Sequence, residues 1–137
     1  MFEKALELAL KYHKGQKKMK TGESYMVHIL RVTMKMKTEE EMIVALLHDI
    51  LEKSVLTLND LKKLGFSKNV LSAVDCLTRR KSESYDKTIA RIIKNKLAVR
   101  VKIADLEDNM NISNWNNVTD TVKLNRHKKY WQMLVKL

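Results

Sequence analysis

The chain of 137 residues contains no proline, only three glycines and a single cysteine. Sheet proteins with tight hairpins commonly place more proline and glycine at their turns, so this scarcity favours a helical fold. The one cysteine, Cys76, cannot form an internal disulfide, which is typical of proteins in a reducing cytoplasm. Aromatic residues make up 6% of the chain, too few for an extended platform on which nucleic-acid bases stack.

Long hydrophobic runs are also missing. No apolar run reaches the ~18 residues that a membrane-spanning helix requires. The most apolar stretch, from Met42 to Leu51, is short and contains His48 and Asp49. The first residues, MFEKALELALKYHK, mix acids and bases with apolar side chains, which is not the pattern of a signal peptide. The sequence therefore predicts a cytoplasmic protein without a membrane partner.

The charge is strongly unbalanced, with 27 Lys and Arg against 16 Asp and Glu and a formal net charge of +11. The bases cluster at residues 11–20, at 87–102 and from 123 to the end. Such a field attracts anions, whether nucleic acid, phosphorylated metabolites or an acidic membrane surface. A lysine-rich surface can equally serve only to keep the protein soluble, so charge alone does not select a function.

The pattern of apolar residues predicts one all-α domain over residues 1–137. Hydrophobic residues make up 45% and charged residues 31% of the chain, which is ordinary for a globular domain. Thr38 and Glu41 form a capping-box pattern that opens the third helix, which is expected to run to Leu51 or Glu52. Apolar periodicity and caps, Thr57 and Ser67 among the caps, predict helices over residues 2–10, 25–36, 39–52, 58–64, 68–78, around 89–93, 97–110 and 118–134, with a loop over 15–24. The helix over 97–110 has apolar residues on more than one face, which predicts that it is buried in the middle of the domain.

A histidine–aspartate pair lies inside the most apolar predicted helix, in the segment VALLHDILE. His48 and Asp49 lie three and four residues after Ala45 and four and three residues before Glu52, so a continuous helix would present all four on one face. Burying a charge without a partner is costly, and a metal ion would compensate both side chains of the pair. A lone pair of this kind also occurs by chance on helix surfaces, so it does not define a site by itself.

Two further polar residues interrupt apolar segments. Asp105 lies in VRVKIADLEDNMN, with Asn109 one helical turn later and Lys102 as a possible ion-pair partner. His28 lies in YMVHILRV, where the ordinary interpretation is a hydrogen-bonded core histidine. Together with the pair at 48–49, these residues form a set of two histidines and two aspartates. Such a mixed nitrogen and oxygen set suits manganese, iron, magnesium or zinc.

Six segments, taken in order, resemble the HD-domain phosphohydrolases, and among them the small hydrolases akin to the hydrolase domain of RelA/SpoT enzymes. The segments are A..LA...H.GQ (5–16), TGESY..H (21–28), ALLHDILE (45–52), TL.DL...GF (57–66), LTRR..ESY (77–85) and VKIADLEDNM (101–110). Each is loose alone, whereas their ordered combination is specific. The match covers residues 3 to about 112, and the last predicted helix, 118–134, carries little of it.

The resemblance implies an all-α HD fold around one divalent metal ion, commonly manganese. The family pattern places the metal ligands at His28, His48, Asp49 and Asp105. RelA/SpoT-type hydrolases remove the 3′-diphosphate from guanosine tetraphosphate or pentaphosphate. The expected partner is therefore an anionic phosphorylated small molecule, and we do not expect nucleic acid.

The resemblance also implies roles around the metal. The family carries two acids shortly after the HD dipeptide; the first is Glu52 here, and the second is replaced by Lys53. Metal-assisted hydrolysis uses a bound water of lowered pKa, and Glu52 is expected to orient or deprotonate that water. Asn109 matches an asparagine that helps hold the nucleoside, and Tyr25 matches a position beside the binding cleft.

Two lysines of the loop before the second predicted helix are expected to meet phosphate oxygens as point charges. They are Lys20, which matches a family position beside the cleft, and Lys18.

The chain departs from the family pattern at four positions. Met19 stands where the guanosine-specific enzymes have an arginine that stacks on the base, and Ile112 replaces a threonine. Asp108 occupies a place that the larger enzymes more often give to His or Tyr, and Lys53 reverses the sign of a catalytic position. Guanosine tetraphosphate as the substrate therefore does not follow from the resemblance.

Three hypotheses remain open from the sequence. The first is a metal-dependent phosphohydrolase acting on a phosphorylated nucleotide. The second is a protein of the same fold that binds nucleotides as a sensor without turnover, which Lys53 favours. The third is a basic nucleic-acid binder, which only the net charge supports. Metal analysis separates the third hypothesis from the others, and turnover of a nucleotide panel separates the first from the second.

Overall fold

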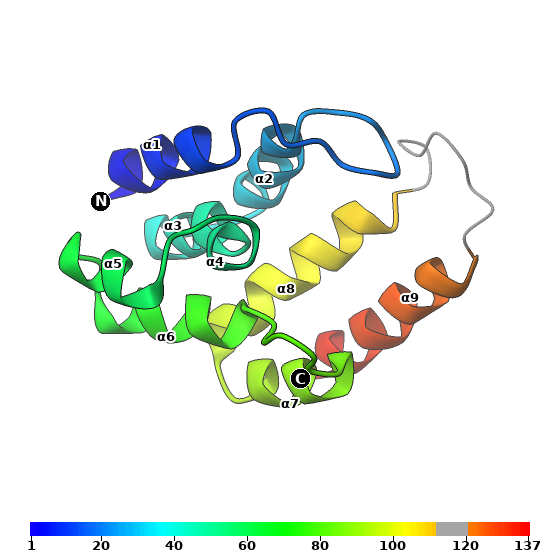
Figure 1. Cartoon of the computed structure of the whole chain (residues 1–137). Coiled ribbons are helices and arrows are strands. Elements are labelled where there is room, and N and C mark those ends of the chain that lie inside the picture. The colour runs from blue at the N-terminus through cyan, green and yellow to red at the C-terminus, as the bar shows by residue number, and fades with distance from the viewer. Residues whose placement is uncertain (112–120) are drawn as a thin grey trace.

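The computed structural model describes residues 1–111 and 121–137, and the chain in these two stretches is folded into helices (Figure 1). The helices are α1 (Phe2–Tyr12), α2 (Tyr25–Met34), α3 (Glu39–Leu47), α4 (Ile50–Lys53), α5 (Leu58–Lys63), α6 (Lys68–Leu77), α7 (Tyr85–Ile93), α8 (Lys96–Asn109) and α9 (Thr121–Val135). No strand is present in the part of the chain that the structure describes; its only β-type pairing is an isolated bridge between Lys17 and Ser24. The all-α prediction is confirmed.

Helices α3 and α8 form the centre of the molecule. Helix α3 packs against α1, α2, α6 and α8, and α8 also contacts α2, α6, α7 and α9 (Figure 1). The core side of α8 carries Ala98, Val101, Ala104 and Leu106, each at most 3% exposed. Because both central helices are enclosed on several sides, polar side chains that they direct inward lie in the interior.

The predicted helix starts at Thr38, Thr57 and Ser67 are confirmed. Thr38 accepts a hydrogen bond from the backbone N–H of Glu41, whose carboxylate accepts the N–H of Thr38 in return. Thr57 forms the same reciprocal box with Asp60 at the start of α5, and the hydroxyl of Ser67 accepts the N–H of the third residue of α6. These caps satisfy backbone N–H groups that a helix start leaves without partners.

The prediction of one continuous helix from residue 39 to 52 is wrong. Helix α3 ends at Leu47, and α4 begins at Ile50, so the chain leaves the helix at His48 and Asp49. Both the backbone N–H and the imidazole Nδ1 of His48 bond to the carbonyl oxygen of Ala45, at 3.4 and 2.6 Å. A side chain that bonds its own helix backbone in this way competes with the regular ladder of hydrogen bonds.

The C-terminal helix was expected over 118–134, and the structure gives it as Thr121–Val135. Residues 118–120, and the departure at Ile112, lie outside the described residues.

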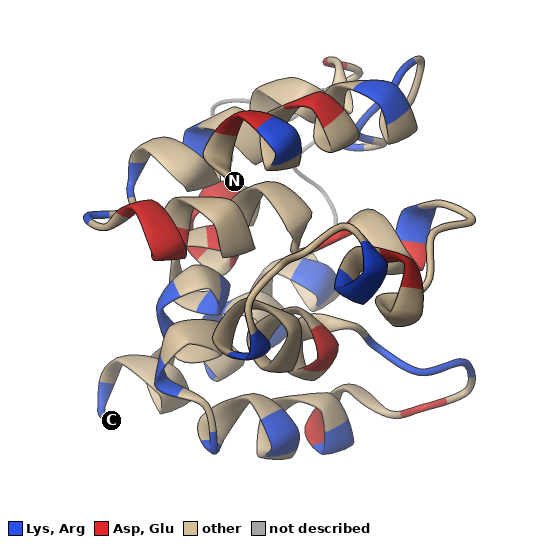
Figure 2. Cartoon of the chain, turned by 90° about the vertical axis from the view of Figure 1, so that its left-hand side faces the viewer, with Lys and Arg blue, Asp and Glu red and all other residues tan. Residues whose placement is uncertain are grey.

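None of the helices within residues 1–111 and 121–137 has the length and apolar character of a membrane span. Figure 2 shows basic segments spread over helices and loops, with acidic segments between them.

We expect Thr38→Ala to lower the free energy of unfolding by about 1 kcal/mol, the usual cost of losing a helix N-cap. The hydroxyl of Thr38 is the partner of the Glu41 N–H at 3.1 Å, and alanine supplies none. Urea unfolding followed by circular dichroism measures the change. Lys37→Ala, one residue earlier and outside α3, is the control. Equal stabilities of the two variants would show that the hydroxyl adds nothing.

Candidate metal centre

Four side chains that are distant in the sequence meet in the interior. His28 comes from α2, His48 and Asp49 from the break between α3 and α4, and Asp105 from α8. One potential ligand atom of each lies within 4.8 Å of those of the others. Three of the four side chains are buried and Asp49 is half-buried. The structure therefore brings together the four residues that the resemblance gave as metal ligands.

The imidazole of His48 is oriented by the helix that ends beside it. Its Nδ1 lies 2.6 Å from the carbonyl oxygen of Ala45, and a carbonyl can only accept a hydrogen bond. Nδ1 therefore carries a hydrogen and donates it to that oxygen, which directs Nε2 toward the carboxylates of Asp49 and Asp105, 3.2 and 3.4 Å away. Fixing the tautomer through the second nitrogen is how proteins orient histidine ligands of metals.

His28 is oriented by Asp108, whose Oδ2 lies 2.6 Å from Nδ1 of the imidazole. The other oxygen of Asp108 accepts a hydrogen bond from Nε of Arg31 at 2.5 Å, and Arg31 in turn pairs with Glu23. Burial raises the pKa of Asp108, but the bonds from His28 and Arg31 outweigh it and lower that pKa to about 2. Asp108 is therefore a permanent acceptor, and Nε2 of His28 faces the cluster.

The two Nε2 atoms converge on one oxygen. His28 Nε2 lies 3.0 Å and His48 Nε2 lies 3.4 Å from Oδ1 of Asp105. Both nitrogens are buried, and neither makes a hydrogen bond of acceptable geometry. Burial lowers the pKa of His48, yet Asp49 and Asp105 outweigh it and raise that pKa well above its ordinary value. The cluster thus favours positive charge at the point where nitrogen and oxygen donors meet, which fits a divalent cation.

Asp105 is held on both of its oxygens. Lys102 donates to Oδ2 at 2.9 Å, and the side-chain amide of Asn109 donates to Oδ1 at 3.2 Å. Burial raises the pKa of Asp105, but Lys102 and the two histidines lower it well below its ordinary range. The pairing of Lys102 with Asp105 that the sequence suggested is confirmed.

Asp49 and Tyr25 are joined by a short hydrogen bond. The Tyr25 hydroxyl donates to Oδ2 of Asp49 at 2.5 Å. Burial, followed by the nearby charge of Asp49, raises the pKa of Tyr25 far above its ordinary value, so the phenol keeps its proton. Tyr25 is 7% exposed; its hydroxyl bonds the candidate ligand Asp49, and the residue also lines the cleft.

A cleft of about 170 Å³ opens beside the cluster. Its walls include the candidate ligands His48, Asp49 and Asp105. The other lining residues are Lys18, Tyr25, Glu52, Lys53, Leu77, Arg79, Tyr85, Thr88, Ile89, Lys102, Asn109, Lys123 and His127. Lys20 lines a separate pocket of about 20 Å³, so the structure does not place it in the main cleft.

Glu52 and Lys53 lie side by side on the wall formed by α4. Burial, and next the charge of Asp49, raise the pKa of Glu52 above its ordinary value. The ammonium of Lys53 lies 5.3 Å from the centroid of the Tyr25 ring. Gln16 fixes this part of the chain by donating to the backbone carbonyl of Lys53 at 2.9 Å. The acid and the base therefore both line the cleft that contains the candidate ligands.

The side chain of Asn109 bonds one residue of the cleft wall and one residue of the cluster. Its oxygen accepts a hydrogen bond from Lys18, and its amide nitrogen donates to Asp105. The ammonium of Lys18 also lies 5.6 Å from the Tyr25 ring centroid. Met19, the neighbour of Lys18, is 94% exposed.

Sequence reasoning missed the roles of four residues of this region. Asp108 and Arg31 orient His28, and the spacing of Asp108 one turn after Asp105 could have indicated an inward position. His13 is fully buried and stacks on Tyr25, with ring centroids 5.1 Å apart. Its spacing to Gln16 in the H.GQ segment was the available signal. His127 lies on α9, beyond the resemblance, and no sequence pattern marked it.

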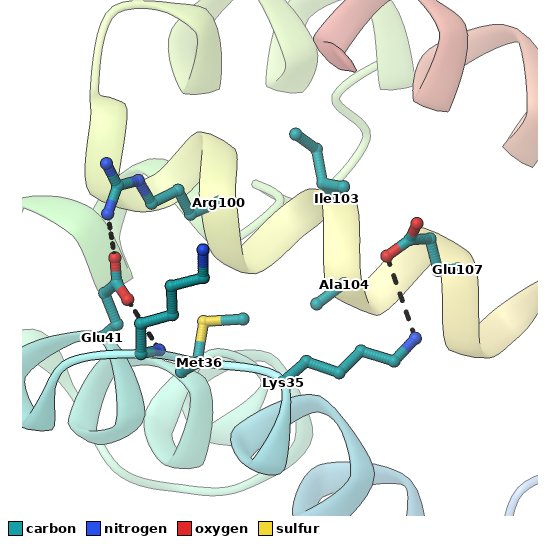
Figure 3. Close-up of a pocket in the computed structure, with 8 residues that line it drawn as sticks. Lys35, Met36, Glu41, Arg100, Ile103, Ala104 and Glu107 are labelled. Carbon is teal, nitrogen blue, oxygen red and sulfur yellow. Dashed lines mark hydrogen bonds and ion pairs between the residues drawn. The ribbon is translucent and has the colours of Figure 1, made fainter.

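A larger cleft, of about 410 Å³, lies on the opposite stripe of α8 (Figure 3). Its lining residues are Lys35, Met36, Lys37, Glu41, Arg100, Ile103, Ala104 and Glu107. Glu41 pairs with Arg100, and Lys35 lies 3.8 Å from Glu107, so most of its charges are matched. None of the candidate ligands faces this cleft. We therefore assign the chemistry to the smaller cleft.

Two relatives and one solved structure are among the known proteins that this chain is similar to, whereas no protein-family model matches the chain. The chain is 32% identical, over 79% of its length, to the guanosine-3′,5′-bis(diphosphate) 3′-pyrophosphohydrolase of Aquifex aeolicus. It is 31% identical, over 80% of its length, to the GTP pyrophosphokinase of Myxococcus xanthus. It spans only 17% of the length of each relative.

The solved structure is a metazoan ortholog of SpoT that hydrolyses ppGpp. The superposition has a TM-score of 0.77 at 24% identity and covers 98% of this chain and 82% of that one. This likeness shows that the two proteins share a fold.

Proposed function

We propose that this chain is an HD domain of the RelA/SpoT-like type and, from that premise, that it is a metal-dependent phosphohydrolase of a phosphorylated nucleotide. The observation that carries the proposal is the convergence of His28, His48, Asp49 and Asp105 beside a basic cleft. The substrate that we propose is a guanosine 3′-diphosphate 5′-di- or triphosphate, with pyrophosphate released from the 3′ position. The named activities of the relatives support this choice.

The metal that we propose is manganese, with iron, zinc and magnesium as the other candidates. Two imidazole nitrogens and two carboxylates form a donor set that suits a borderline divalent cation. When bound, such an ion polarises a phosphoryl oxygen and lowers the pKa of a coordinated water.

The chain's own residues supply binding and proton transfer. Lys18, Lys53 and Arg79 line the cleft, and their charges suit adjacent phosphate groups. We propose that Asn109 contacts the nucleoside and that Lys20 meets phosphate at the outer end. Glu52 is the proposed general base, and its raised pKa makes its carboxylate a stronger base than an ordinary glutamate.

Turnover of a panel of phosphorylated nucleotides by the manganese-loaded protein tests the proposal. The panel contains guanosine tetra- and pentaphosphate, the corresponding adenosine compounds and ordinary nucleoside triphosphates, and released phosphate and pyrophosphate are measured. We expect hydrolysis of a 3′-phosphorylated nucleotide that stops when the metal is chelated. A metal-loaded protein that hydrolyses none of them would refute the enzyme function.

The second candidate function is a nucleotide sensor without turnover, which the position of Lys53 favours. Its ammonium lies in the cleft near Tyr25, where the family has an acid. A lysine that is charged cannot accept a proton, and its charge can hold a phosphate product in the cleft. Binding of the panel without hydrolysis would support this function over the first.

We expect Lys53→Asp to raise hydrolysis of guanosine tetraphosphate roughly tenfold. This increase is smaller than the roughly 10²–10⁴-fold that a complete acid–base group contributes to a rate, because Glu52 is already in place. Adding Met19→Arg should raise it further by supplying a cation that stacks on the base. Steady-state rates with manganese measure both effects. Lys62→Asp, which makes the same charge change on α5, is the control. If the native chain is already as fast as the double variant, neither departure limits the reaction.

A further inference from the structure

Helix α9 forms a wall of the cleft. It packs against α8, which carries Asp105 (Figure 1). Two α9 side chains, Lys123 and His127, lie one helical turn apart and both line the cleft. The same two residues, with Lys18 and Asn109, also line the small pocket next to it. His127 therefore lies where the two pockets meet.

His127 is a buried polar side chain that the fold does not use. It is 8% exposed, and it makes no hydrogen bond or ion pair within residues 1–111 and 121–137. Its ring nitrogens are not among the fully buried side-chain atoms that lack a partner, so they stay accessible from the cleft that the residue lines. A buried imidazole that lines a cleft is therefore placed to bond a group that enters the cleft.

The electrostatic surroundings keep this imidazole neutral. Burial is the main cause that lowers the pKa of His127, to about 4; Asp105 acts in the opposite direction, and the cations Lys102, Arg126 and Lys123 act in the same direction as burial. At neutral pH the ring thus has one N–H donor and one acceptor nitrogen. It adds a directional hydrogen bond to a basic wall without adding another charge.

We propose that His127 is a substrate-binding residue whose imidazole donates a hydrogen bond to a phosphoryl oxygen of the bound nucleotide. The inference rests on the proposed function only in the identity of the ligand. Phosphoryl oxygens are the expected acceptors, because the cleft wall around His127 contains Lys18, Lys102 and Lys123. A neutral donor there bonds only an oxygen that lies in the right direction, whereas a further lysine would hold substrate and product alike.

Binding of inorganic pyrophosphate to the full manganese-loaded chain, measured by isothermal titration calorimetry, tests the inference. His127→Phe keeps a ring but removes the donor, and we expect pyrophosphate to bind about tenfold more weakly. His127→Gln keeps an N–H donor and should recover part of the affinity. Lys128→Gln, at the exposed neighbouring position, is the control and should stay within about twofold. In turnover, His127→Phe should raise KM about tenfold with kcat unchanged.

Unchanged pyrophosphate affinity in a folded His127→Phe protein, or no pyrophosphate binding by the native protein, overturns the inference. If the phenylalanine variant does not fold, as judged by thermal melting, His127→Leu replaces it in the same comparison. The proposed function fails separately. Pyrophosphate binding that depends on His127, without turnover of any nucleotide, would refute the hydrolase and leave the inference standing. Normal turnover of a nucleotide, with pyrophosphate binding that does not depend on His127, would overturn the inference and leave the hydrolase standing.

Discussion

Asp105→Asn is expected to remove most of the metal from the protein. In the proposed site, Asp105 supplies the oxygen to which both histidine Nε2 atoms point, at 3.0 and 3.4 Å. Asparagine has nearly the same shape, so α8 should still pack. It lacks the negative charge that offsets a divalent cation, and it leaves Lys102 without its counter-ion. An unpaired lysine charge this close to the cluster would itself repel a cation.

Elemental analysis of the dialysed protein measures this effect. We expect about one metal ion per native chain and nearly none in the variant. Asp75→Asn, which removes the same charge from α6, is the control and should retain the metal. Circular dichroism establishes that the variant is folded. A folded Asp105→Asn protein with full metal content would show that the ligand assignment is wrong.

Glu52→Gln is expected to keep the metal and to lower kcat by roughly 10²–10⁴, the contribution of a positioned general base. Glu52 lines the cleft, but it is not one of the four converging residues. Glutamine preserves its size and cannot accept a proton. The raised pKa of Glu52 adds to the expected loss, because it marks a carboxylate that binds a proton more tightly than an ordinary glutamate does.

Two measurements on one preparation separate the roles of Glu52. Elemental analysis should give the native metal content, and steady-state hydrolysis of the substrate found in the panel should give the loss in kcat. Glu40→Gln, an exposed position in the first turn of α3, is the matched control. Native turnover in Glu52→Gln would mean that this side chain is only a solvated end of α4.

The parts of the fold that the sequence predicted well depend on local interactions. The capping boxes at Thr38 and Thr57 involve side chains three residues apart, so their sequence pattern contains the whole interaction. The inward position of α8 followed from apolar residues on more than one of its faces. The break at His48 could not be predicted in this way, because a side-chain bond to Ala45 competes there with the helix.

The candidate site, like the fold, has a part that the sequence predicted and a part that it did not. The four proposed ligands could be named because they match an ordered family pattern, although their separate segments are loose. The contacts around them could not be named, since Asp108 bonds His28 and Arg31 across the space between α8 and α2. His127 reaches the cleft from α9, where the family pattern had ended. Long-range contacts of this kind follow from the packing of helices and leave no periodic mark in the chain.

The chain of bonds from His28 through Asp108 and Arg31 to Glu23 has a consequence for how this region opens. Glu23 belongs to the loop before α2, and this loop also carries Lys18. The backbone carbonyl of Glu23 accepts a hydrogen bond from the backbone N–H of Lys18. A fluctuation that releases the loop must therefore break the bond between Glu23 and Arg31, which also holds Asp108. The loop and the histidine thus share one cooperative unit, and their amide hydrogens should exchange with solvent at related rates.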